Sequence, residues 1–251
     1  MAAIPGAEYW GPLPDTNFAK SAGRRSIIGA TIHHIDGSLA AADSTFKSVG
    51  RKSSACYGVG RDGRIVYWLD PEWMVDYHAC QAQWQGYIGI ENESDPNNDN
   101  EPLSAAQIDA CARIAKFHRI PGVFISRQGE PGVGYHRQFS AGGCDHGWGN
   151  TSCPGIGVIA QIPDIVDAIN GGPPPTPTRK VNSKMWMAAI LDKKWCDVYY
   201  NGVLVDAFPN DGPLGIGEAM KRYIDAGAAY TIFKTEADYA PARKRLAAAA
   251  T

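Results

Sequence analysis

The sequence predicts an α/β domain with a mixed β-sheet flanked by helices, followed by a small α+β C-terminal module. Over residues 1–170, short β-branched or apolar segments alternate with amphipathic helical segments, which is typical of an α/β domain. Hairpin and strand patterns return over residues 179–251. Between the two parts, the Pro-rich residues 171–178 favour an extended, semi-rigid linker.

The strands predicted in the first part are short and punctuated by turns. A buried strand at 26–33 ends on histidine. A hairpin is expected over 57–68, because Asp62-Gly63 supplies its turn. A second buried strand, at 87–91, ends on an acidic residue.

Two helices are predicted to cover this sheet. Ser104 and Gln107 have the spacing of a capping box, which predicts a helix from 104 to about 118. A second helix is expected over 157–169, interrupted near Pro163, because proline lacks the backbone donor that a helix needs.

The C-terminal part shows its own pattern and its own charge. Residues from 179 onward carry 11 Lys and Arg against 8 Asp and Glu, whereas the preceding residues carry 13 against 18. The predicted elements are a strand at 186–190, a hairpin at 197–205 around Asn201-Gly202, a helix around 216–226, a strand at 230–233 and a basic Ala-rich terminal helix.

Composition and charge exclude several classes of protein. A net charge of −2 and a pI near 6.3 show no excess of positive charge that would bind nucleic acid or an anionic membrane. We find no apolar run of about 18 residues and no signal-peptide pattern at the N-terminus. Six scattered cysteines favour reduced thiols over a disulfide framework. We therefore expect no nucleic-acid partner, no membrane partner and no export signal.

Several residues could hold a metal ion. They are His33, His34, His136, His146 and Cys153. A hydrolytic zinc site needs three imidazole or thiolate ligands and one open position. Each of these residues alone is more typical of a structural role, and their spacing does not resemble a zinc finger.

The order of six short segments changes that interpretation. Together they resemble the type-2 N-acetylmuramoyl-L-alanine amidases, the family of phage amidases, bacterial amidases and peptidoglycan-recognition proteins. The resemblance spans roughly residues 25–170 and implies a mixed sheet flanked by helices, with zinc in a groove on one side. The segments are Ile32-His-His34, Ser54-Ala-Cys-Tyr-Gly-Val59 with Arg61-Asp-Gly63, Tyr77-His-Ala79, Ile88-Gly-Ile-Glu91, Tyr135-His-Arg-Gln138 and Thr151-Ser-Cys-Pro-Gly155.

The resemblance implies that His33, His136 and Cys153 hold Zn²⁺. One alternative stays open, because His136 lies 17 residues before Cys153 and His146 only 7. We prefer His136, whose Tyr-His-Arg context fits a strand end. A site closed by a fourth ligand, His146 or Cys144, would instead be structural.

The resemblance also implies the groups that act on the substrate. Glu91 matches an acid that moves a proton, and Glu93 is the fallback. Thr151 matches a position that faces the substrate and could polarise its carbonyl or bind peptide. Cys56 stands where many relatives have His, and the tyrosine that assists catalysis in some relatives falls on Ala55.

Other residues could line the groove or fill the core. His34 and His78 are equally compatible with both roles. Four aromatic residues could stack on sugars, although such residues more often belong to the core. They are Trp73, Trp84, Tyr87 and Trp148.

These observations predict a zinc-dependent amidase that cuts peptidoglycan between the lactyl group of N-acetylmuramic acid and L-alanine. We expect a phage endolysin, made in the host cytoplasm and acting on the cell wall after release. The assigned parts are a catalytic domain at 1–170, a linker at 171–178 and a wall-binding module at 179–251, whose positive charge suits an anionic wall polymer. The alternative is a non-catalytic peptidoglycan-recognition protein, against which the presence of Cys153 counts.

Overall fold

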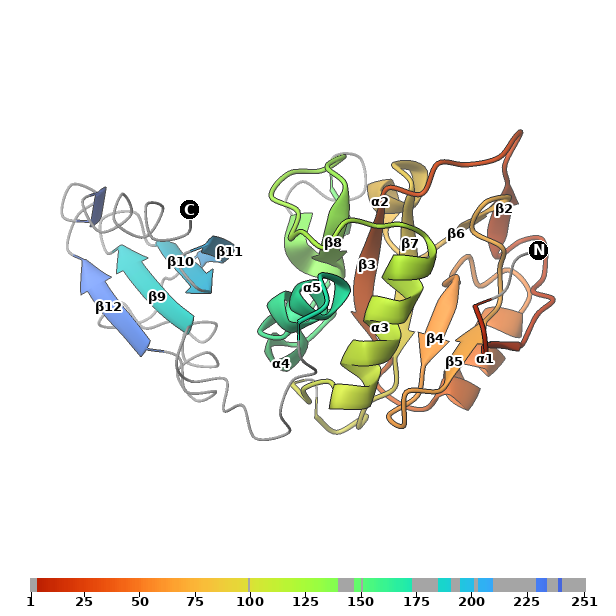
Figure 1. Ribbon diagram of the computed structural model, residues 1–251, viewed down its shortest axis with the longest axis horizontal. Helices are drawn as coiled ribbons and strands as arrows, with labels where there is room; N and C mark the ends of the chain where they lie inside the picture. Colours follow the sequence, from red (N-terminus) through yellow and green to blue (C-terminus); the bar gives the residue numbers. More distant parts are fainter. Residues whose placement is uncertain are drawn as a thin grey trace. The chain divides into compact units, whose positions relative to one another are not determined.

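The computed structural model describes most of the first part of the chain and the strands of the second. The described residues are 4–98, 100–139, 147–149, 151–172, 185–190, 195–200, 203–209, 229–233 and 239–240. The chain divides into two compact units, Met1–Pro177 and Thr178–Thr251 (Figure 1).

The first unit is built on a six-stranded mixed sheet with the strand order β1-β5-β4-β7-β3-β8. Strands β3, β4, β7 and β8 run parallel, whereas β5 is antiparallel to β4. The predicted mixed sheet and the predicted hairpin are therefore confirmed. The strands are β1 (Glu8–Tyr9), β3 (Gly29–His34), β4 (Tyr57–Val59), β5 (Ile65–Tyr67), β7 (Tyr87–Asn92) and β8 (Gly132–Tyr135), and a separate pair joins β2 (Phe18–Lys20) to β6 (Met74–Asp76).

Helices cover both faces of this sheet. The capping box of Ser104 opens α3 (Ala105–Phe117) as predicted, and α3 lies beside α5 over one face (Figure 1). On the other face, Leu39 of α1 lies directly over Gly58 of β4, where an added Cβ would come within 2.7 Å of it. The helices are α1 (Leu39–Lys47), α2 (Cys80–Trp84), α3, α4 (Ile156–Ile159), α5 (Ile162–Ile169) and the short 3-10 helix η1 (His136–Phe139).

The predicted helix over 157–169 is two helices. Helix α4 ends at Ile159, and α5 begins at Ile162 with Pro163 in its first turn. The interruption therefore precedes Pro163, since a proline in a first turn removes no helical hydrogen bond.

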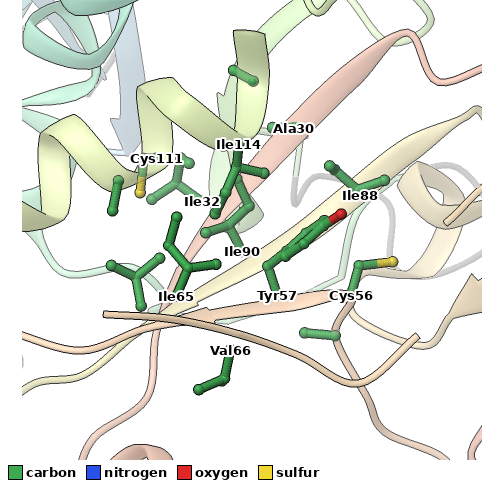
Figure 2. Close-up of a cluster of buried hydrophobic side chains, with 14 of the residues drawn as sticks. Ala30, Ile32, Cys56, Tyr57, Ile65, Val66, Ile88, Ile90, Cys111 and Ile114 are labelled. Atoms are coloured by element: carbon green, nitrogen blue, oxygen red, sulfur yellow. The ribbon is translucent and has the colours of Figure 1, made fainter. Parts of the chain in front are cut away.

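Side-chain alternation divides the central strands into two functional faces. Ile32, Ile88 and Ile90 pack toward α3 with Cys111 and Ile114 in the buried core (Figure 2). Because successive side chains of a strand point to opposite faces, His33 and Glu91 project away from α3. They are cross-strand partners at the carboxyl end of β3 and β7, which is where open α/β sheets bind their ligands.

The cysteines differ in oxidation state. Four are free, namely Cys56, Cys111, Cys153 and Cys196, whereas Cys80 is disulfide-bonded. The expectation that all thiols are reduced is therefore wrong for Cys80. Nothing in its sequence context signalled this, because no close cysteine pair surrounds it.

The second unit contains a four-stranded sheet with the order β11-β10-β9-β12. The predicted strands at 186–190 and 230–233 and the hairpin at 197–205 are confirmed, although a β-bulge interrupts the hairpin between Val198 and Tyr199. The strands are β9 (Met185–Ile190), β10 (Trp195–Tyr200), β11 (Val203–Pro209) and β12 (Ala229–Phe233). The helix predicted around 216–226, the terminal helix and residues 173–178 of the linker lie outside the described residues.

We searched the described residues for a helix long and apolar enough to cross a membrane and found none.

Candidate metal centre

Three segments that are distant in sequence bring His33, His136 and Cys153 together. His33 lies near the end of β3, His136 begins η1 directly after β8, and Cys153 lies before α4. One potential ligand atom of each lies within 4.8 Å of the others. Cys153 Sγ is 3.7 Å from His33 Nδ1, and the two imidazole rings are 4.5 Å apart at their centroids.

This geometry fits a tetrahedral zinc ion. Bonds of about 2.3 Å to sulfur and about 2.0 Å to nitrogen place the two donor atoms about 3.5 Å apart, close to the 3.7 Å that separates Cys153 Sγ from His33 Nδ1. Burial, followed by the neighbouring His136 and His78, holds the pKa of His33 well below its ordinary value. Burial likewise lowers the pKa of His136 to about 4. Both imidazoles are therefore neutral, as metal ligands must be.

The surroundings of Cys153 affect the ionisation of its thiol and fix the position of its backbone. Burial raises the pKa of the Cys153 thiol well above its ordinary value, so a cation is needed to favour the thiolate. The backbone N–H of His34 donates to Sγ at 3.4 Å. The Cys153 backbone is fixed on both sides, because its N–H donates to Thr151 Oγ1 and its carbonyl accepts from the N–H of Arg137.

Glu91 supplies a carboxyl group beside this cluster. Its Oε1 lies 3.9 Å from His33 Nδ1. Burial, with smaller contributions from Asp36 and Asp76, raises the pKa of Glu91 to about 8. A carboxyl group that ionises near neutral pH can both accept and return a proton.

The family model described as N-acetylmuramoyl-L-alanine amidase matches residues 23–156, and this range includes all three clustered residues and Glu91. The chain belongs to this family. The resemblance found in the six sequence segments is thereby confirmed. No match is found among curated proteins.

Several solved structures, among them N-acetylmuramoyl-L-alanine amidases, are similar to this family member at low identity. LysC from Clostridium intestinale URNW aligns at 13% identity and a TM-score of 0.41, covering 66% of this chain and 98% of that one. The hydrolase AmiA of Staphylococcus aureus aligns at 14% identity and a TM-score of 0.38, covering 54% and 67%. A mutant of PlyL aligns at 11% identity and a TM-score of 0.45, covering 66% and 99%. The assignment to the amidase family rests on the family model alone.

The remaining candidate residues of this amidase-family chain fall into different places. His34 lies outside the cluster and pairs through Nδ1 with Asp36 Oδ1 at 3.1 Å. The carboxylate of Glu93 accepts from the backbone N–H groups of Leu39 and Arg61, so it caps α1. His146 and Cys144 lie outside the described residues.

The aromatic candidates separate into exposed and buried pairs. Trp84 is 58% exposed and Trp73 is 50% exposed. Tyr87 and Trp148 are fully buried and pack edge to face at 4.9 Å, so they belong to the core and cannot stack on sugars. The backbone of Trp148 also makes a hydrogen bond with His136, which fixes the orientation of that ring.

A groove of about 610 Å³ opens beside the metal cluster. His78 and His136 line it together with Tyr77, Trp84 and Lys52. The groove therefore connects the proposed ligand His136 to an exposed aromatic side chain at the surface.

One buried acid next to this groove was missed by the sequence interpretation. Asp76 is completely buried, and its Oδ2 lies 3.0 Å from Nδ1 of His78. The available signal was the spacing of two residues, which places both side chains on one side of an extended segment.

Proposed function

We propose that this chain is a zinc-dependent N-acetylmuramoyl-L-alanine amidase that hydrolyses the amide between the lactyl group of N-acetylmuramic acid and L-alanine in peptidoglycan. The observation that carries the proposal is the convergence of His33, His136 and Cys153 at the carboxyl end of the sheet, with Glu91 beside them. Membership of the amidase family supplies the substrate class.

His33, His136 and Cys153 would hold the zinc ion. Two imidazoles and one thiolate form a donor set that suits zinc and leaves one coordination position for water or substrate. When bound, zinc lowers the pKa of a coordinated water and polarises a carbonyl oxygen.

Glu91 would move the proton during hydrolysis. Its carboxylate takes a proton from the attacking water as the new carbon–oxygen bond forms. It returns that proton to the amine of L-alanine as the carbon–nitrogen bond breaks. Thr151 accepts its hydrogen bond from Cys153, which leaves its own hydroxyl proton to donate to the substrate carbonyl.

The second unit would bind the cell wall, with 179–251 as the wall-binding module, 171–178 as the linker and 1–170 as the catalytic domain. Its excess of Lys and Arg over Asp and Glu suits an anionic wall polymer. The role of a phage endolysin, made in a host cytoplasm and released to the wall, stays a prediction.

The test combines metal analysis with end-group chemistry on purified peptidoglycan. We expect one zinc per chain and the appearance of new alanine amino termini without new reducing sugar ends. A chelator should abolish this release, and added zinc should restore it. Zinc bound at full stoichiometry without new alanine termini would refute the enzymatic proposal and favour a recognition protein.

A further inference from the structure

Asp76 is a buried charged group that the proposed chemistry does not use. Its side chain is fully buried at the end of β6. Oδ2 accepts hydrogen bonds from the backbone N–H groups of Cys56 at 3.0 Å and Gly89 at 2.8 Å. Burying a carboxylate costs free energy unless hydrogen-bond or charged partners compensate. A completely buried aspartate such as Asp76 therefore indicates a functional role.

The fold brings His78 unusually close to the sheet at this point. A Cβ at Gly89 of β7 would lie 2.7 Å from Cβ and Cγ of His78 and 3.0 Å from Asp76 Oδ2. Only glycine therefore lets the Asp76 and His78 side chains lie against β7. His78 Nδ1 is 3.0 Å from Asp76 Oδ2, which keeps the proton of a neutral His78 on Nδ1 and leaves a lone pair on Nε2.

His78 in turn faces the proposed metal ligand His33. The two rings are nearly perpendicular, at 86°, with centroids 5.3 Å apart. A nitrogen-to-nitrogen hydrogen bond of about 3 Å between two ring edges separates their centroids by roughly 5 Å. Nε2 of His33 and both ring nitrogens of His78 are buried, and none of the three makes a well-oriented hydrogen bond in this structure, although His78 Nδ1 lies 3.0 Å from Asp76 Oδ2.

The chemistry of imidazole connects these two nitrogens. His33 Nδ1 is the nitrogen that faces Cys153 and Glu91. A metal on Nδ1 leaves the proton on Nε2, which then needs an acceptor. Ligating histidines almost always donate their second N–H to such a partner, which fixes the ring and strengthens the ligand.

We propose that Asp76 and His78 are positioning residues for the metal centre, with Asp76 holding His78 in the tautomer whose Nε2 accepts the N–H of metal-bound His33. This inference rests on the proposed function, because it requires that His33 binds zinc. It assigns the buried carboxylate of Asp76 and the three unpartnered nitrogens of His78 and His33 to one chain of contacts that runs from Asp76 through His78 to His33.

The test is the zinc affinity of purified variants, measured by competition with a chelator of known affinity. His78→Phe keeps a ring but removes both nitrogens, and Asp76→Asn keeps the shape but presents a donor to His78 Nδ1. We expect each to weaken zinc binding 10- to 100-fold, as loss of an outer hydrogen-bond partner typically does. His78→Gln retains an acceptor near the Nε2 position and should recover part of the loss.

A matched control separates this role from a structural one. His118 is a second partly buried histidine of the same unit, bonded to Tyr57 at 2.7 Å, and His118→Phe should leave zinc affinity unchanged. Thermal unfolding of the metal-free variants reports whether each one folds. In zinc-loaded wild type, the nitrogen NMR shifts of the histidine side chains should show a protonated Nε2 on His33 and an unprotonated Nε2 on His78.

Two results would overturn the inference. If the wild-type chain binds zinc and releases alanine termini while His78→Phe and Asp76→Asn bind zinc as tightly, the positioning role is wrong and the proposed function stands. A change confined to the KM for peptidoglycan would likewise place His78 in substrate binding instead. If the wild-type chain binds no zinc, the proposed function and this inference fail together.

Discussion

His118 on one face of the six-stranded sheet differs from His33 and His78 on the other in how the ring nitrogens are paired. On the face covered by α3, Nε2 of His118 is paired with the hydroxyl of Tyr57 at 2.7 Å. On the opposite face, Nε2 of His33 and Nε2 of His78 are both buried without a hydrogen-bond partner. Because buried polar atoms are normally paired, a cluster of unpaired imidazole nitrogens indicates a site that a ligand completes.

A second cavity of similar volume lies on the face covered by α3. A cavity of about 560 Å³ is lined by His118, Tyr57 and residues 24–27, before β3. Its ionic groups are engaged, since Arg24 pairs with Glu72 and Arg25 donates to three backbone carbonyls. The groove beside the metal cluster is slightly larger, at about 610 Å³, and it is lined by His78, whose buried ring nitrogens make no well-oriented hydrogen bond.

The largest expected effect is the loss of a metal ligand. His136→Ala should abolish both zinc binding and amidase activity, because two remaining ligands cannot hold a catalytic zinc ion. Metal analysis and release of alanine termini check this expectation. His146→Ala should keep both properties, and the reverse pattern for the two variants would transfer the ligand role to His146.

The second largest effect is expected at Glu91, where a substitution should impair catalysis without loss of the metal. Glu91→Gln should retain zinc but lower kcat by about 10²- to 10⁴-fold, the usual contribution of a general base. Glu93→Gln is the matched control, because that carboxylate caps α1 and should affect stability more than turnover. Full activity in Glu91→Gln with loss in Glu93→Gln would assign the proton transfer to Glu93.

On the face covered by α3, the free energy of unfolding should depend on pH through His118. Burial lowers the pKa of His118 to about 4, against 6.5 for an ordinary histidine. The unfolded chain therefore binds more protons between these values, and the free energy of unfolding should fall as the pH drops from 6.5 toward 4. His118→Phe should flatten this part of the pH profile in urea unfolding, and an unchanged profile would contradict the assignment.

The smallest effect is expected at the partner of His118. Tyr57→Phe removes the hydroxyl that pairs with Nε2, and a lost hydrogen bond of this kind costs about 1 to 3 kcal/mol. Urea unfolding measures the loss, while zinc stoichiometry should remain at the wild-type value. A loss of zinc in Tyr57→Phe would show that the two faces are not independent.

The sequence predicted most of what depends on local pattern. The strand ends that carry His33 and Glu91, the capping box of Ser104 and the hairpin at Asp62-Gly63 all follow from periodicity or turn chemistry. The grouping of His136 and Cys153 with His33 came from the family resemblance, because no spacing rule joins residues so far apart in the chain.

Other features depend on tertiary packing and could not be predicted. Asp76 reads as an ordinary polar residue at a strand end, and its complete burial arises because Gly89 leaves room for it against β7. Trp148 is one of four candidates for stacking on sugars, although core positions are more common for such residues, and Tyr87 and Phe139 enclose it in the core. The preference for His136 over His146 comes from its Tyr-His-Arg context, and His146 lies outside the described residues.

The most direct test of the central claim is X-ray absorption spectroscopy of the zinc-loaded protein at the zinc edge. We predict one sulfur at about 2.3 Å, two imidazole nitrogens at about 2.0 Å and one further oxygen from solvent. Cys153→Ser should remove the sulfur contribution while His118→Phe leaves the spectrum unchanged. A first coordination shell without sulfur, or one filled by four protein ligands, would contradict the assignment of His33, His136 and Cys153 as an open catalytic site.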